Sequence, residues 1–467
     1  MHTVGFRQGF EFLDFKLVIA LKGMQNILVI GAGRSSHTLI SYLLSTAAKE
    51  GWLITVADAQ PELAEKKVAG HPNGLPVWLD VNKPNDRKDL IRRVNIVISL
   101  LPAHLHTPIA QDCLLLGKHL LTASYITPEI QALDALVREK QLIFLGEMGF
   151  DPGIDHMSAM EKINSIKARG GKLLALRSYA GGLVAPESND NPWHYKFTWN
   201  PRNVVLAGRG TTQYLDGGTY KYVPYHQLFK RTKRVHIDGL GEFDMYPNRD
   251  SLTYRRHYGL EHIPNLVRGT LRYPGFCDAW SALIDLGLTD DAMPIEESSN
   301  MRYRDLIDAF TSGNGGSLME RVAQQLHLQI DDAVMQKLSW LDLFGNKKIK
   351  CEFCTPAKIL ESLLIEKWLM KPTDRDMVIL QHEIDYSLNG RLMFWKSSLV
   401  QKGSNAEQTA MNKLVGLPLA IATKLIMKGK IHLGGVRIPV DDDIYEPVLA
   451  ELKKEGVVFT ETEREME

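Results

Sequence analysis

The sequence has few cysteines and no excess of charge of either sign. Its 467 residues include only Cys113, Cys277, Cys351 and Cys354, too few for a disulfide framework, and we therefore expect a reducing, cytoplasmic environment. Lys plus Arg and Asp plus Glu both number 55, so the formal net charge is zero. A neutral chain has no general attraction to nucleic acid or to anionic membranes, and neither is expected as a partner.

Long hydrophobic runs are also missing. No apolar run approaches the roughly 20 residues that span a bilayer. Residues 10–21 are largely apolar, but charged residues interrupt them and no small-residue cleavage site follows, so they do not fit a signal peptide. Because the first predicted strand begins just after Met24, residues 1–23 are expected to be an N-terminal extension that is dispensable for the fold.

The segment Cys351-Glu352-Phe353-Cys354 has the spacing of half a zinc site or of a redox pair. A structural zinc ion needs two more ligands, and no second close pair of Cys or His accompanies this one. We therefore predict no metal site, and we interpret the two cysteines as ordinary thiols.

A glycine turn between a buried strand and a helix is the strongest local signal. The apolar run Asn26–Ile30 is followed by Gly31-Ala32-Gly33-Arg34-Ser35. Gly31 permits a tight turn, and Gly33 lets the backbone approach a pyrophosphate that would lie on the N–H groups of the helix start. The segment predicts dinucleotide binding; the alternative is a structural strand–turn–helix.

An acidic residue stands where the cofactor ribose is expected. Asp58 ends the second apolar strand, predicted over residues 53–57. A carboxylate there can accept a hydrogen bond from a ribose 2′-hydroxyl and would repel a 2′-phosphate. The sequence therefore favours NAD over NADP.

Apolar strands alternate with helices up to about residue 150. This rhythm predicts a parallel sheet with helices on both faces, a doubly wound Rossmann fold of class α/β. Ligands bind beyond the carboxyl ends of such strands, so residues there should face the cofactor or substrate. Further strands are predicted at 77–79, 95–101, 119–122 and 142–146, and helices at 61–68, 86–93, 107–116 and 128–140.

After about residue 150 the pattern of predicted strands and helices changes. Paired strands are predicted at 377–384 and 392–398, and residues 275–370 are mainly helical. A long helix over 408–427 then leads to a short returning segment near 433–438. This pattern predicts a second, mixed α/β region with a helical insertion.

Several unusual segments occur in one order along the chain. They are Ile98-Ser99-Leu100-Leu101-Pro102 with His106, Thr122-Ala123-Ser124-Tyr125-Ile126, Gly149-Phe150-Asp151-Pro152-Gly153-Ile154-Asp155-His156, Asn191-Pro192-Trp193-His194-Tyr195-Lys196-Phe197, Tyr246-Pro247-Asn248-Arg249-Asp250-Ser251 and Arg268-Gly269-Thr270-Leu271-Arg272-Tyr273. Together they resemble the glutamate-forming saccharopine dehydrogenases, from Met24 to the C-terminal helix.

The resemblance implies a domain plan and a reaction. Residues 24–150, completed by about 405–467, would form an NAD-binding Rossmann domain. Residues 151–274 with 371–404 would bind substrate and form a homodimer, with 275–370 as the helical insertion. Family members oxidise the secondary amine of saccharopine with NAD or NADP and hydrolyse the imine to L-glutamate and 2-aminoadipate 6-semialdehyde, or run the reverse reaction, in lysine metabolism. The fungal enzymes carry an arginine after the second strand. In this chain the corresponding segment is Asp58-Ala59-Gln60, which is similar to that of the NAD-using animal enzymes.

The resemblance also assigns residues to the cofactor and the substrate. The expected catalytic residues are Asp151, which would orient or accept a proton, and Tyr125, which would donate to the substrate; the alternative for Asp151 is a turn cap. Asp155 is expected mainly to cap the turn, and His156 to be a packing residue rather than a general base. The expected cofactor contacts are Gly31, Ala32, Gly33, Arg34, Ser35, Asp58, Asp80, Val81, Ser99, Leu100, Leu121, Thr122, Met148, Gly149, Phe150 and Trp199. The expected substrate contacts are Ala123, Ser124, Asp151, Arg249, Arg268, Gly269, Thr270 and Arg272; for the arginines, structural ion pairs are the alternative.

Two other functions remain open at this point. A related dehydrogenase could act on another carboxyalkyl amine, such as carboxynorspermidine, although fewer carboxylates would need fewer arginines. A non-catalytic NAD-sensing protein could keep the fold without turnover. Substrate-dependent NADH formation separates an enzyme from a sensor.

Overall fold

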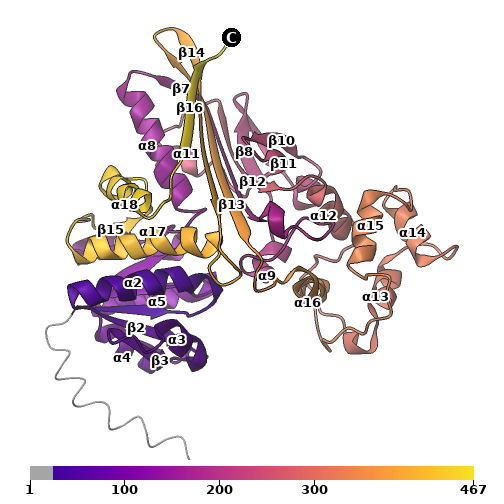
Figure 1. Cartoon of the computed structure of the whole chain (residues 1–467), viewed down its shortest axis with the longest axis horizontal. Helices are drawn as coiled ribbons and strands as arrows, with labels where there is room; N and C mark the ends of the chain where they lie inside the picture. The colour runs from indigo at the N-terminus through magenta and orange to yellow at the C-terminus, as the bar shows by residue number, and fades with distance from the viewer. Residues whose placement is uncertain (1–24) are drawn as a thin grey trace, which may run out of the picture. The chain divides into compact units, whose positions relative to one another are not determined.

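The computed structural model describes residues 25–467, so the expected extension over residues 1–23 lies outside the described part (Figure 1). The chain forms two compact units. The first contains the described residues up to Ile154 together with Leu414–Val448, and the second contains Asp155–Lys413 together with Leu449–Glu467. Each unit is described by itself.

The first unit is built on a seven-stranded parallel sheet with the order β15-β6-β5-β4-β1-β2-β3. The order of its first six strands in sequence is that of a doubly wound Rossmann sheet, which confirms the predicted fold class. Every residue of the central strand β1 is buried, as helices on both faces require. The strands are β1 (Asn26–Ile30), β2 (Leu53–Asp58), β3 (Gly74–Trp78), β4 (Ile96–Ser99), β5 (His119–Thr122), β6 (Ile143–Leu145) and β15 (Gly435–Arg437).

The helices of the first unit follow the predicted rhythm with one break. The predicted helix over 128–140 is two helices, because Leu133 donates its backbone N–H to Ile130, three residues back, and so interrupts the regular four-residue ladder. The helical elements are η1 (Arg34–Ser36), α2 (His37–Glu50), α3 (Pro61–Val68), α4 (Pro84–Arg92), η2 (Ala103–Leu105), α5 (His106–Leu116), α6 (Pro128–Gln131) and α7 (Asp134–Glu139), together with parts of α17 (Ala410–Met427) and α18 (Asp442–Lys454).

One helix of the described chain, α17, is long and apolar enough to span a membrane by length and composition, but 72% of it is buried inside the protein. It runs beside α2 (Figure 1). At Gly416 an added Cβ would lie 2.8 Å from the backbone nitrogen of Leu39, so a glycine is needed where the two helices approach. Burial and close packing are the properties of a core helix.

The second unit holds a nine-stranded sheet with the main order β10-β11-β12-β7-β13-β14-β16, while β8 pairs with β12 and β9 with β8. Strands β7 and β12 are parallel, and the other pairs are antiparallel. The strands are β7 (Lys172–Val184), β8 (Thr212–Asp216), β9 (Thr219–Val223), β10 (Lys233–Ile237), β11 (Gly241–Pro247), β12 (Asn265–Arg272), β13 (Asp376–Leu388), β14 (Arg391–Lys402) and β16 (Thr460–Glu465).

The C-terminal strand corrects one predicted boundary. Residues 405–467 were expected to complete the nucleotide-binding domain, but only Leu414–Val448 belong to that unit. Strand β16 pairs with β14 from Met393↔Glu465 to Ser398↔Thr460, so its backbone hydrogen bonds place the end of the chain in the second unit.

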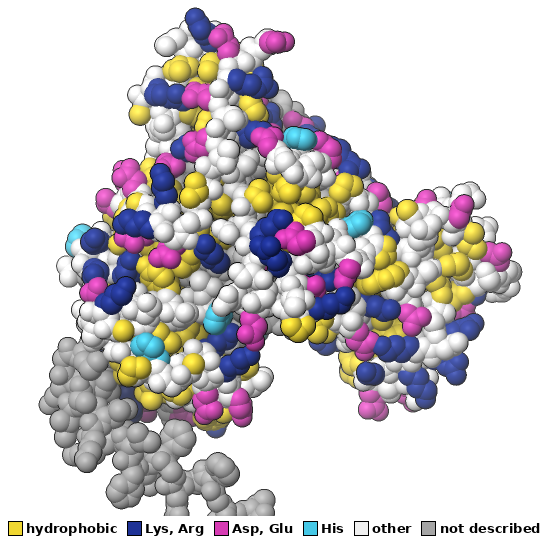
Figure 2. Space-filling model, viewed as in Figure 1, with side chains coloured by type: hydrophobic (Ala, Val, Ile, Leu, Met, Phe, Trp, Pro, Cys, Tyr) yellow, Lys and Arg dark blue, Asp and Glu magenta, His cyan; other side chains and the backbone are white. Residues whose placement is uncertain are grey.

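Residues 275–370 of the second unit are mainly helical, as the sequence pattern predicts. Buried aromatic side chains, among them Trp193, Trp280 and Trp368, form one core with these helices. On the face shown in Figure 2, basic, acidic and apolar side chains are interspersed. The helices are α8 (Ile154–Ala168), η3 (Pro186–Ser188), α9 (Pro201–Val205), α10 (Tyr225–Leu228), α11 (Tyr254–His257), α12 (Phe276–Asp285), η4 (Ser298–Asn300), α13 (Tyr303–Phe310), α14 (Leu318–Gln325), α15 (Ala333–Trp340) and α16 (Pro356–Trp368).

The cysteines divide into two pairs of different character. Cys351 and Cys354 are joined by a disulfide, so the interpretation of this pair as ordinary thiols is wrong. Cys113 and Cys277 are free and buried.

Candidate cofactor and substrate sites

The glycine turn after β1 has the geometry that phosphate binding requires. Gly31 has φ +107°, and an added Cβ would meet the backbone oxygen of Leu100 at 3.3 Å, so only glycine fits. A Cβ on Gly33 would meet nothing within 4 Å, which leaves space beside the backbone. The turn leads through η1 into α2, whose first N–H groups have no carbonyl partner within their own helix. These features fit a dinucleotide pyrophosphate.

Asp58, at the end of β2, fastens this turn. Its Oδ2 accepts a hydrogen bond from the backbone N–H of Ala32 at 2.7 Å, and its Oδ1 accepts from the N–H of Gln60 at 2.9 Å. Asp58 as a residue is half-buried, so part of it is exposed at the carboxyl end of the strand. It lies where a cofactor ribose is expected in this fold.

The expected adenine-side residues form a fixed turn after β3. Asp80 accepts from the N–H of Asn82 at 3.0 Å, and the carbonyl of Val81 accepts from Arg87 at 2.6 Å. Arg87 is itself held by the buried carboxylate of Asp112, at 2.6 Å. The turn is therefore anchored to the helices beneath the sheet.

His106 belongs to one of the sequence motifs, but sequence reasoning assigned it no role in the site. Its Nδ1 lies 2.9 Å from Ser99 Oγ, and its Nε2 lies 2.9 Å from Ser124 Oγ. The imidazole thus connects the ends of β4 and β5, where ligands bind in this fold. Burial, reinforced by His104, lowers the pKa of His106 from its usual 6.5 to about 4, so the ring is neutral at pH 7. The available signal was a histidine shortly after a buried strand that ends in serine.

The low pKa of His106 predicts an acid-sensitive first unit. The unfolded chain binds more protons than the folded chain between pH 6.5 and 4, so stability falls as the pH drops through this range. Between pH 7 and pH 5 we expect the free energy of unfolding to fall by about 2 kcal/mol on account of this residue. Urea unfolding at both pH values measures this fall. In the His106→Gln variant, the free energy of unfolding should fall by about 2 kcal/mol less between the two pH values than in the wild type. An equal fall in both proteins would contradict the lowered pKa of His106.

The segment after β6 is held close to the ends of β5. The backbone N–H groups of Glu147 and Met148 donate to the carbonyls of Ser124 and Thr122, at 2.9 and 3.1 Å. Met148, Phe150, Leu121 and Thr122 are buried, and Leu100 is half-buried. These expected cofactor residues therefore gather at the carboxyl edge of the sheet.

Asp151 follows directly, in a turn with a cis Asp151–Pro152 peptide bond. Gly149 donates its N–H to the carbonyl of Pro152, and Ile154 donates to the carbonyl of Gly149, both at 2.9 Å. An added Cβ on Gly153 would lie 2.1 Å from Gly149 O, so this turn requires glycine. Asp151 and Tyr125 are both half-buried in the first unit.

In the second unit, Arg268, Thr270 and Arg272 share one face of β12, because side chains alternate along a strand. Arg268 is buried, and its Nη2 donates to Asp155 Oδ2 at 2.7 Å. Its guanidinium also lies over the ring of Tyr254, 4.5 Å from the centroid. Asp155, expected mainly as a turn cap, is the ion-pair partner of Arg268.

Further polar residues lie near this pair. Ser158 Oγ lies 2.8 Å from Nε2 of the buried His382, and burial lowers the pKa of His382 to about 4. His156, expected to be a packing residue, is buried, stacks on Tyr254 and lies 2.6 Å from the hydroxyl of Tyr258. Ser158 and His382 were not foreseen, since 224 residues separate them in sequence.

Arg272 has different surroundings from Arg268. Its guanidinium lies 5.2 to 5.7 Å from the rings of Tyr195, Tyr246 and Phe276, and it donates to the carbonyl of Leu271. Within residues 25–467 it has no carboxylate partner. An aromatic cage stabilises a buried guanidinium through cation–π contacts, and this favours a structural role for Arg272.

Arg249 lies in an exposed turn, with φ +42°. The turn is tied to β12, because Asn248 donates its N–H to the carbonyl of Arg268, and Ser251 accepts from the N–H of Arg268. Trp199 is half-buried and packs on the aromatic core of the second unit. All the expected cofactor contacts except Trp199 lie in the first unit. The expected substrate contacts are divided: Ala123, Ser124 and Asp151 lie in the first unit, and Arg249, Arg268, Gly269, Thr270 and Arg272 lie in the second.

A doubly wound parallel sheet with this glycine turn and an acidic residue after its second strand defines the dinucleotide-binding class of oxidoreductase folds. The profile of the saccharopine dehydrogenase NADP binding domain matches residues 27–145, and that of the saccharopine dehydrogenase C-terminal domain matches residues 149–457. The chain belongs to the saccharopine dehydrogenase family.

Individual relatives agree with this assignment. The chain is 33% identical to the NADP(+)-dependent, L-glutamate-forming saccharopine dehydrogenase of Pyricularia oryzae, over 92% of this chain and 97% of the relative. It is 34% identical to the mitochondrial alpha-aminoadipic semialdehyde synthase of Bos taurus, over 93% of this chain but only 47% of that longer protein. The structure of apo saccharopine dehydrogenase (L-Glu forming) from Saccharomyces cerevisiae superposes with a TM-score of 0.85 at 29% identity, covering 94% of this chain and 100% of the other.

Proposed function

We propose that this protein is an NAD-linked, L-glutamate-forming saccharopine dehydrogenase. It oxidises the secondary amine that joins the glutamyl and lysyl parts of saccharopine, and water cleaves the resulting imine to L-glutamate and 2-aminoadipate 6-semialdehyde; the reverse is reductive condensation. The observation that carries the proposal is the end-to-end likeness, in sequence and in fold, to enzymes named for this activity.

The preference for NAD rests on Asp58. When bound, the nicotinamide supplies the hydride acceptor. The turn at Gly31–Gly33 would hold the pyrophosphate, and the Asp58 carboxylate would accept from the 2′-hydroxyl and repel a 2′-phosphate. The fungal relatives are named as NADP(+)-dependent enzymes, so this chain would differ from them in cofactor choice.

Substrate binding would use charge complementarity. Saccharopine has three carboxylates, and the planar guanidinium groups of Arg249 and Arg268 suit two-point carboxylate capture, with the Thr270 hydroxyl as a further donor. The ion pair with Asp155 orients Arg268 before any ligand arrives. Asp151 or Tyr125 would take the proton that the amine loses and help to activate the attacking water.

The test is absorbance of the reduced cofactor with purified protein and saccharopine, with NAD and NADP in parallel. Turnover that favours NAD is expected. Turnover that favours NADP would keep the reaction and overturn the cofactor argument. Folded protein that binds NAD without turnover would contradict the proposed reaction, and would favour a different amine substrate or a sensor.

A further inference from the structure

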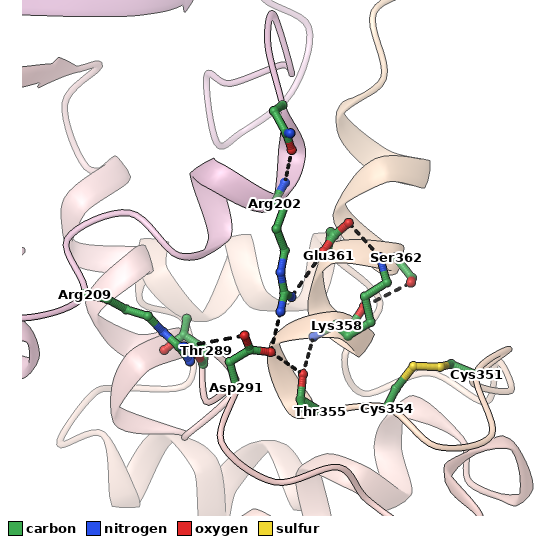
Figure 3. Close-up of polar contacts among 11 residues, drawn as sticks. Arg202, Arg209, Thr289, Asp291, Cys351, Cys354, Thr355, Lys358, Glu361 and Ser362 are labelled. Atoms are coloured by element: carbon green, nitrogen blue, oxygen red, sulfur yellow. Dashed lines mark hydrogen bonds and ion pairs between the residues drawn. A yellow bond between two sulfur atoms is a disulfide. The ribbon is translucent and has the colours of Figure 1, made fainter. Parts of the chain in front are cut away.

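The Cys351–Cys354 pair lies in the helical region of the second unit, on a short loop before α16 (Figure 3). The two Cα atoms are 5.9 Å apart, within the usual range for a disulfide. None of the expected cofactor or substrate residues belongs to this loop. Its chemistry is therefore separate from the proposed function.

The two sulfur-bearing residues differ in exposure. Cys354 is 7% exposed, whereas Cys351 is half-buried and the intervening Glu352 and Phe353 are exposed. Thiol–disulfide exchange needs access to one sulfur atom, so a solution thiol would reach Cys351 first. Cys351 is thus the outer cysteine, which a thiol or disulfide in solution would contact first. Cys354 is the inner cysteine, which would attack a mixed disulfide formed on Cys351.

Three lysines and the start of a helix flank the loop. Lys347, Lys348 and Lys350 directly precede Cys351, although Glu366 pairs with two of them. Cys354 precedes Thr355, which caps the N-terminus of α16 by accepting from the N–H of Lys358. Nearby lysines and a helix N-terminus both lower the pKa of a cysteine thiol.

The loop is also connected to the rest of the second unit. Thr355 donates to Asp291 at 2.6 Å, and Asp291 pairs with Arg202 of α9 at 2.5 Å (Figure 3). Burial opposes ionisation of Asp291, but the hydrogen bonds from Thr355 and Arg202 outweigh it and hold the pKa of Asp291 below its usual value. Arg202 also pairs with Glu361 of α16. A change at the cysteines therefore acts on the start of a helix that several ion pairs hold in place.

We propose that Cys351 and Cys354 form a reversible disulfide that exchanges with low-molecular-weight disulfides of the glutathione class. The Cys351 thiolate attacks the glutathione disulfide, forms a mixed disulfide and releases one glutathione thiolate. The Cys354 thiolate then attacks the Cys351 sulfur of the mixed disulfide and releases the second glutathione. The protein dithiol is oxidised by two electrons, and the glutathione disulfide is reduced to two thiols.

The first test measures the redox state of each cysteine by differential alkylation and mass spectrometry, after equilibration of the full chain over a series of glutathione ratios. We expect Cys351 and Cys354 to pass together from dithiol to disulfide as the ratio becomes oxidising. Cys113 and Cys277 are matched internal controls, because burial raises the pKa of both thiols and they should remain reduced. A pair that stays in one state across the series would overturn the proposal.

The second test traps the intermediate. With glutathione disulfide, the Cys354→Ser variant should accumulate a glutathione adduct on Cys351, because the resolving thiol is missing. The Cys351→Ser variant should carry much less adduct, since Cys354 is buried. Equal labelling of both variants would contradict the assigned order of attack.

The third test measures stability. Reduction should lower the Tm of the wild type by about 2–5 °C. The disulfide closes a loop and so restricts the unfolded chain, which means that the oxidised chain loses less conformational entropy on folding than the reduced chain. The Cys351→Ser/Cys354→Ser double variant should not respond to reductant, and an equal response would show that the effect lies elsewhere.

Discussion

Replacing Arg268 by methionine is expected to lower the free energy of unfolding of the second unit by about 3–5 kcal/mol, because the buried Asp155 carboxylate then loses its ion pair with Arg268. The kcat/KM for saccharopine should fall by about 10- to 100-fold as well, as expected for the loss of a charge-assisted hydrogen bond to a substrate carboxylate. Urea unfolding followed by tryptophan fluorescence and steady-state kinetics measure the two effects.

A second substitution separates the two effects. The double variant Asp155→Leu/Arg268→Met removes both charges, and it should regain most of the lost stability, since apolar replacement of a buried ion pair is often neutral. Its kcat/KM should remain low. If activity returned together with stability, Arg268 would be a structural residue alone.

Arg177→Met is the matched control for this experiment. Arg177 lies on the neighbouring strand β7 and pairs with Asp385 at 2.7 Å. It stands opposite Val267 in the register, so its side chain lies on the other face of the sheet from Arg268. This pair is more exposed, and we expect a loss of stability below about 1 kcal/mol and unchanged kinetics.

Asp58→Asn is expected to reduce the preference for NAD over NADP by about 10- to 100-fold, because a charged hydrogen-bond acceptor contributes about 1.5–3 kcal/mol. The amide oxygen can still accept from the backbone N–H of Ala32, so the turn should keep its shape. The measurement is the ratio of kcat/KM values for the two cofactors, at constant saccharopine concentration.

The control for a general change in charge is Asp86→Asn. Asp86 is exposed in the first turn of α4, in the same unit. Its cofactor ratio should equal that of the wild type. An Asp58→Asn ratio that also equals the wild type would remove the main argument for NAD.

The first unit could largely be predicted from sequence, because buried parallel strands are short apolar runs that a local pattern reveals. Strand β3 shows where this fails: residues 77–79 were predicted, whereas the strand is Gly74–Trp78. Pro76 lies inside it, and an edge strand tolerates proline because one side of its backbone has no ladder partner. The sequence pattern cannot show that a strand will lie at an edge.

The second unit and its site were less predictable. Strand β16 (Thr460–Glu465) has no apolar residue and is fully exposed, so only its backbone pairing with β14 defines it. The partners Asp155 and Arg268 are 113 residues apart, and no local spacing links them. The residue types at the site could be recognised, but their pairing depends on tertiary structure.

The order in which the chain is made has a consequence for its folding. The Rossmann sheet is incomplete until Gly435–Arg437 can pair with β6, and α2 lacks its close neighbour α17 until residue 427 has been synthesised. On the ribosome, part of the apolar surface of the N-terminal strands and helices therefore stays uncovered until more than 250 residues of the other unit have emerged. Exposed apolar surface of this kind makes a partly synthesised chain prone to aggregation.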